Sequence, residues 1–290
     1  MDDASPIHEY ITDVEFKQAV ALLDSGNASE LELHLSRHPR IVSDSARFSE
    51  TDFVGGTQEG QYFEQPKLLW FVAENPIRNG ALPGNITEIA QVIIDREREV
   101  APNNLQTDLD YTLALVTSGN IPRHSGHQSD LVGVLVKNGA DPDCADAALA
   151  HGEREAVQVL LDKGAKVDLL IAAGMGLHDE LSRLAATSDS ETKQKALSCA
   201  ANCRQPESCR LLIEAGANPN KYNPNGFHAH CTALHSAISV GTLETVEVLL
   251  SGGADPGIKD TMFDGDALGW ANHMGRDEIK LVIEKHLENS

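Results

Sequence analysis

The sequence has little positive charge and few aromatic side chains. Its 290 residues include 23 lysines and arginines against 44 aspartates and glutamates, the net charge at pH 7 is −21, and aromatics make up 4%. Nucleic acids and anionic membranes attract proteins through a basic face that displaces counterions, so this charge argues against both as partners. Partners or ions of positive charge are compatible with it.

Cysteines and long apolar runs are also scarce. Five unevenly spaced cysteines do not make a disulfide framework. The longest apolar run, residues 68–73, is too short to cross a bilayer, and the acidic start of the chain has no apolar leader. We therefore expect a cytoplasmic protein that does not enter membranes.

Familiar catalytic signatures are missing as well. The sequence contains no nucleophile elbow, no Walker loop and no dinucleotide-binding fingerprint. These absences favour a binding protein over an enzyme.

What the sequence does contain is a repeated phrase, Gly-Ala-Asp/Asn-Pro. Gly241 lies twelve residues before the phrase glycine Gly253, and the apolar stretch between them predicts a helix closed by a glycine cap. A helix, a glycine turn, a second helix and a glycine cap together make one repeating unit. The phrase occurs at 139–142, 216–219 and 253–256, with a degenerate copy at 164–167.

Residues 232–237, Thr-Ala-Leu-His-Ser-Ala, resemble the Thr-Pro-Leu-His-x-Ala signature of ankyrin repeats. The resemblance implies an all-α, ankyrin-type helical solenoid of helix pairs joined by β-hairpin fingers. About eight pairs cover nearly the whole chain. We place them near 12–38, 66–98, 109–139, 145–164, 168–187, 193–216, 229–253 and 265–288.

We interpret residues 1–290 as a single solenoid with three segments. Degenerate repeats with long insertions occupy 1–108, repeats with short fingers 109–192, and the best-matching repeats and cap 193–290. In the central segment the cap glycine and the next turn glycine are only 12 to 13 positions apart, against 22 to 25 near the C-terminus. The fingers are therefore expected to be missing in the middle. A further long connection is expected at 40–66.

Two insertions and a run of small side chains predict a central pocket. The turns inside the second and third pairs lengthen at 75–84 and 119–126, where they carry Arg78 and Arg123. Small residues at 172–176 would form the floor between them. The alternative is that the short fingers reflect drift in a scaffold without a pocket.

The resemblance also implies which side chains face a partner, because the two residues before each helix-ending glycine point to the concave surface of an ankyrin array. The insertions and the C-terminal fingers add further candidates. The candidate binding residues are Glu74, Asn75, Arg78, Arg123, His124, His151, Met175, Asn202, His228, His230, Trp270 and His273.

His228 and His230 have a second interpretation. On a strand they would share one face and could hold a divalent metal such as zinc or copper. The sequence has no His-Glu-x-x-His and no paired Cys-x-x-Cys, so we favour a role in lining the finger and expect no cofactor. His235 matches the ankyrin motif histidine, whose implied role is a hydrogen bond within the repeat. Cys199 and Cys203 share a helix face, where buried thiols would fill small sites.

The leading functional hypothesis is a binding module whose concave face recognises a protein or peptide, since ankyrin arrays generally bind proteins. The alternative is an enzyme or small-molecule receptor in the central pocket. There Arg78 and Arg123 would hold a small anionic ligand, because arginine presents a bidentate fork. His151 or His228 would transfer a proton, with Glu74 as orienter or base.

Overall fold

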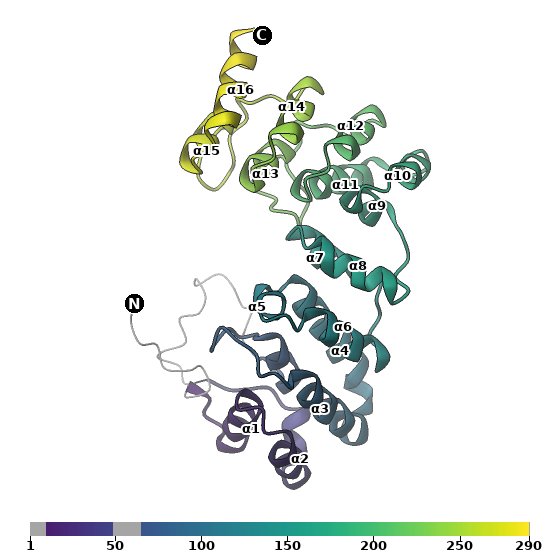
Figure 1. The fold of residues 1–290 in the computed structure, drawn as a ribbon, viewed down its shortest axis with the longest axis vertical. Helices are drawn as coiled ribbons and strands as arrows, with labels where there is room; N and C mark the ends of the chain where they lie inside the picture. Colours follow the sequence, from purple (N-terminus) through teal and green to yellow (C-terminus); the bar gives the residue numbers. More distant parts are fainter. Residues whose placement is uncertain (1–9, 49–64, 290) are drawn as a thin grey trace. The chain divides into compact units, whose positions relative to one another are not determined.

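The computed structural model describes residues 10–48 and 65–289, and this part of the chain is built from helices joined by turns (Figure 1). The described residues form no β-sheet, only isolated bridges such as that between Tyr222 and Thr232. The all-α fold class is therefore confirmed. No helix in the described ranges is long and apolar enough to span a bilayer. The acidic start, and residues 49–64 of the expected long connection, lie outside the described residues.

The chain divides into two compact units, which we call the first and the second unit. The first comprises Met1–Cys144 with Asp162–Ala165, and the second comprises Ala145–Leu161 with Lys166–Ser290. The predicted boundaries at residues 108 and 192 divide the repeats by how well they match the motif. Packing does not test them, so they stay a prediction.

The first unit consists of two rows of helices. In one row α1, η3 and α4 contact each other in turn, and in the other α2, α3 and α6 do so. This alternation is what stacked helix pairs produce. The helices are α1 (Val14–Asp24), α2 (Ala28–Arg37), η2 (Pro39–Val42), η3 (Leu68–Ala73), α3 (Ile86–Val100), α4 (Pro102–Ser118), α5 (Asn120–His124) and α6 (Gln128–Lys137).

Two predicted helix pairs in this unit need correction. The second pair begins with the 3₁₀ helix η3 instead of an α-helix, and η3 ends where Glu74 takes a left-handed conformation. The third pair begins at Pro102, not at residue 109. Proline suits the first turn of a helix because its fixed φ matches the helix and its missing N–H is not needed there.

The second unit repeats the two-row arrangement. In one row α7, α9, α11, α13 and α15 pack in turn, and in the other α10, α12, α14 and α16 do so. Left-handed glycines, Gly176 and Gly241, end α9 and α13 as the repeat pattern predicts. The helices are α7 (Ala145–Ala150), α8 (Arg154–Asp162), α9 (Leu169–Met175), α10 (His178–Ala185), α11 (Ser190–Asn202), α12 (Pro206–Glu214), α13 (Ala233–Val240), α14 (Leu243–Ser251), α15 (Ala267–His273) and α16 (Asp277–Glu288).

The long connections lie where the fingers were expected, between α12 and α13 and between α14 and α15. They are turns and not the β-hairpins that the resemblance implied. Buried side-chain hydrogen bonds hold the first of them in place of a strand ladder. Ser198 Oγ donates to Asn223 Oδ1 at 2.7 Å, and Asn223 Nδ2 donates to Ser236 Oγ at 3.1 Å. We call residues 217–232 the first finger and residues 254–266 the second finger.

Candidate functional site

A buried carboxylate organises the tip of the second finger. Asp260 is 2% exposed, and its carboxylate accepts hydrogen bonds from the backbone N–H groups of Met262 at 2.9 Å, Phe263 at 2.6 Å and Gly265 at 2.9 Å. It also accepts from Trp270 Nε1 at 2.8 Å. One side chain therefore fixes the turn and joins it to α15.

Asp260 keeps its negative charge because its carboxylate oxygens accept all of these hydrogen bonds. Burial would raise the pKa of this carboxyl, but the bonds from Trp270 and from the backbone amides of the turn outweigh burial and hold its pKa well below the usual range. Asp260 is therefore ionised wherever the protein is folded near neutral pH.

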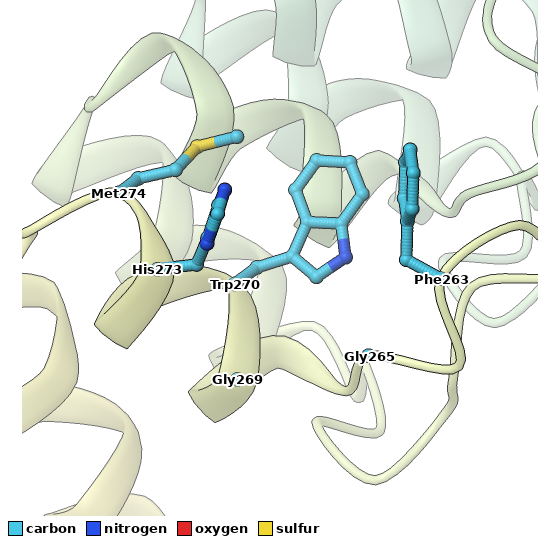
Figure 2. A pocket seen from close by; sticks show the side chains of 6 residues that line it. All are labelled: Phe263, Gly265, Gly269, Trp270, His273 and Met274. Carbon is cyan, nitrogen blue, oxygen red and sulfur yellow. The ribbon is translucent and has the colours of Figure 1, made fainter.

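The ordered turn presents apolar side chains to solvent. Phe263 is 70% exposed and Met262 is 64% exposed, which is unusual for side chains on a well-fixed turn. Beside them is a pocket of about 570 Å³ (Figure 2). It is lined by Phe263, Gly265, Gly269, Trp270, His273 and Met274.

Trp270 stands between Phe263 and His273 in Figure 2. A side-chain carbon on Gly265 would lie 3.0 Å from the Trp270 ring, so glycine is what allows the turn to approach it. On another side His235 packs edge-on at 5.1 Å. The ring is thus held in one orientation before any partner arrives.

His235 has the structural role that the resemblance implied. It is buried, its Nδ1 accepts from the Thr232 backbone N–H at 3.3 Å, and its Nε2 lies 3.2 Å from the carbonyl oxygen of Gly265. Because Nδ1 accepts, Nε2 carries the proton and donates to that carbonyl. Burial lowers the pKa of His235, so the ring stays neutral near pH 7.

Three imidazoles continue from Trp270 across the second unit. The ring centroids of His230 and Trp270 are 6.2 Å apart, those of His228 and His230 6.1 Å, and those of His151 and His228 6.2 Å. The pKa of His151 is lowered, first by burial and then by the neighbouring His228. We call His151, His228 and His230 the histidine row.

The backbone that carries His228 and His230 differs from the predicted strand. His228 and His230 lie in a turn and not on a strand, and His228 has the left-handed φ of 58°. This backbone conformation, uncommon for a side-chain-bearing residue, brings the two rings together. Among the described residues no three His, Cys, Asp or Glu side chains are grouped to hold a metal ion, so the two imidazoles find no third ligand there.

Other candidates in the second unit have structural contacts. Asn202 is half-buried, and its Nδ2 donates to the carbonyl oxygen of Ala150 at 2.7 Å, where α7 ends. Met175 is half-buried and its carbonyl oxygen accepts from Arg154 at 3.3 Å. His273, in contrast, is exposed and lines the pocket beside Trp270.

The small residues at 172–174 do not form an open floor, so that expectation is wrong. They are buried between helices, and a side-chain carbon on Gly174 would lie 2.5 Å from Leu149 and 3.0 Å from Cys199 Sγ. Small side chains are needed there because α7, α9 and α11 pack closely. Cys199, with Cys203 and Cys209, is a buried free thiol as the sequence predicted.

Two candidates in the first unit support their own loop. The Arg78 side chain has no exposed surface, and its Nε donates to Asp24 Oδ1 at 2.8 Å. Glu74 is buried and accepts from the backbone N–H groups of Arg78 at 2.7 Å and Asn79 at 2.9 Å. Asn75 is half-buried beside them. We therefore leave Glu74 and Arg78 out of the candidate surface.

Arg123 and His124 lie on α5 of the first unit, Arg123 half-buried and His124 exposed. His151 belongs to the second unit. A pocket that combines these residues stays a prediction.

Sequence reasoning had missed Asp260, Met262 and Phe263. The signal was present in Asp260-Thr-Met-Phe-Asp-Gly265, where two large apolar residues stand inside a short acidic turn that ends in glycine. Such a turn cannot bury them, so they are either unfavourably exposed or serve for binding.

Comparison with known families agrees with the repeat pattern. Residues 123–260 match the family model for ankyrin repeats, in three copies. The match confirms the predicted ankyrin repeats over these residues. Ankyrin repeats are generally protein–protein interaction modules, which indicates a protein partner. No curated protein matches the chain.

Proposed function

We propose that this ankyrin-repeat protein binds a segment of a partner protein on the second unit, along the surface that runs from Phe263 and Trp270 to His151. The observation that carries the proposal is the pocket at Trp270, where a rigidly held aromatic side chain is left partly uncovered. Binding hot spots are enriched in tryptophan and lie in pockets from which a partner expels water.

Rigidity adds to the argument. Ordering a flexible side chain on binding costs free energy, so side chains that are fixed in advance make affinity easier to reach. Trp270 is fixed by Asp260 and His235, and the turn that carries Phe263 is fixed by the same carboxylate. The exposed apolar area therefore comes with little ordering cost.

The histidine row extends the contact surface beyond a single pocket. Neighbouring rings are about 6 Å apart, which is roughly the span of two residues of an extended chain. A partner segment of several residues could therefore place one side chain in the pocket and lay its backbone along the imidazoles. Each imidazole has two ring nitrogens that can form hydrogen bonds, which suits a peptide backbone.

Catalysis is not part of this proposal. The enzyme alternative used Arg78 as an anion ligand and residues 172–174 as an open floor. The guanidinium of Arg78 is buried against Asp24, and the floor is filled by packed helices. No particular observation favours a reacting group at the remaining histidines.

Selection from a displayed library of random peptides against the full chain tests the proposal. Peptides that bind the wild type should lose roughly tenfold or more in affinity for Phe263→Ala. Phe263 is 70% exposed, so its loss should leave folding intact, which a melting curve checks. The matched control is Leu281→Ala, since Leu281 is 64% exposed on α16 outside the pocket.

A second variant, Trp270→Leu, removes the indole and keeps an apolar side chain. Binding that is unchanged in both pocket variants, or reduced equally by Leu281→Ala, would contradict a partner site at this pocket. The proposal would also be contradicted if the selection enriched no peptide that binds the wild type more tightly than a variant carrying both Phe263→Ala and Trp270→Leu.

A further inference from the structure

The Trp270 ring is electron-rich, and a hydrogen bond from its indole N–H fixes its position. Its Nε1 donates to the ionised Asp260 at 2.8 Å. A carboxylate that accepts from the indole N–H polarises the ring and increases the negative potential over its faces, where cations bind. The pocket lies against this ring, and Phe263, His273 and Met274 surround it in Figure 2.

The charges around the pocket are mostly negative. The second finger carries Asp255, Asp260, Asp264 and Asp266 against the single cation Lys259, a net charge of −3 from four acids and one base. Lys259 is already paired with Asp264 at 2.8 Å. With the net charge of −21 over the whole chain, the field attracts cations and repels anions.

We propose that the pocket takes an arginine side chain of a positively charged partner segment, an inference that rests on the proposed binding function. The guanidinium plane stacks on Trp270, and the aliphatic stem packs against Phe263 and Met274. Arginine fits because its head is planar and weakly hydrated, so it loses less water on stacking than an ammonium group does.

Two other occupants fit less well. A purely apolar side chain would gain the same contact with Phe263 and Met274, but nothing from the charge of the finger or from the Asp260–Trp270 bond. An anionic group would face the acidic finger, whose one cation, Lys259, is paired with Asp264. Charge complementarity therefore selects the basic side chain over both.

Three acetylated pentapeptides that differ only in the central residue test this inference directly. The central residue is arginine, citrulline or norleucine, so that charge and planar shape are varied separately. Binding is followed by NMR on the full chain with labelled tryptophan. The chain has two tryptophans and therefore gives two indole N–H signals. The Nε1 of Trp70 is buried and serves as the internal reference for Trp270.

The arginine peptide should shift the Trp270 signal and bind roughly two- to fivefold more tightly than the citrulline peptide, with the norleucine peptide weaker still. The shift should be lost in Phe263→Ala and kept in Leu281→Ala. Salt should weaken the arginine peptide and leave the other two nearly unchanged.

Equal or tighter binding of norleucine would overturn the inference and leave the proposed function standing, with an apolar anchor in the pocket. No Trp270 shift with any peptide up to its solubility limit would also overturn it. The selection from random peptides then decides separately whether the protein-binding function itself fails.

Discussion

Glu97 should make the stability of the first unit depend on pH. This residue of α3 is fully buried, and neither of its carboxylate oxygens has a hydrogen-bond donor among the described residues. Its neighbour Asp108 is buried on α4 and accepts from Lys67 at 2.7 Å. Burial, followed by the adjacent Asp108, raises the pKa of Glu97 to about 9. When Glu97 is protonated, its carboxyl group can donate a hydrogen bond to Asp108.

The magnitude follows from proton linkage. The unfolded chain releases this proton above a pKa of 4.5, whereas the folded chain keeps it up to about 9. Between these values the unfolded state binds fewer protons, so the free energy of unfolding falls by about 1.4 kcal/mol for each pH unit gained. From about pH 5.5 to about pH 7.5 the loss is roughly 3 kcal/mol.

Denaturant unfolding of the wild type and of Glu97→Gln over this pH range measures the effect. The amide of the variant donates to Asp108 without titrating, so the difference in free energy of unfolding between the two proteins should change by roughly 3 kcal/mol, with the wild type losing stability as pH rises. Glu99→Gln is the matched control, because the Glu99 side chain, two residues further along the same helix, is 65% exposed. Parallel pH curves for the wild type and Glu97→Gln would refute the reasoning.

Three further predictions concern packing, and each is checked by denaturant unfolding. Leu160→Ala should cost about 2–5 kcal/mol, because Leu160 is fully buried on α8; a smaller loss would mean that α8 adds little to the core. Gly174→Ala should cost about 1–3 kcal/mol through the contact with Leu149, and a neutral result would show that α9 can shift. Arg78→Leu should cost about 3–5 kcal/mol, because it removes the buried guanidinium that pairs with Asp24; Asp24→Asn in the same background should recover part of the loss.

Much of the fold was predictable because its signals are local. A glycine cap such as Gly241 acts on the turn that precedes it, and an N-cap such as Asp168 binds a backbone N–H three residues later. These signals recur at a fixed spacing, so helix pairs can be counted without knowing how they pack. Where the local signal was ambiguous, as at Pro102, the predicted start was wrong.

The candidate site was predicted only in part. His151, His228, His230, Trp270 and His273 were chosen from repeat register and composition, and the structure brings four of them into one continuous row of rings. Register could not indicate that Met262 and Phe263 stand exposed on an ordered turn, because that depends on the partners of Asp260.

The sequence by itself determined the repeat architecture, the fold class and the acidic charge, since each depends on residue type and short spacing. Only the tertiary structure decided which polar groups are free to meet a partner. Arg78 is paired with Asp24, 54 positions away in the sequence, and Glu97 is buried against Asp108 of the neighbouring helix. Whether a charged side chain binds a partner or satisfies a neighbour depends on which segments pack together, and no local pattern records that.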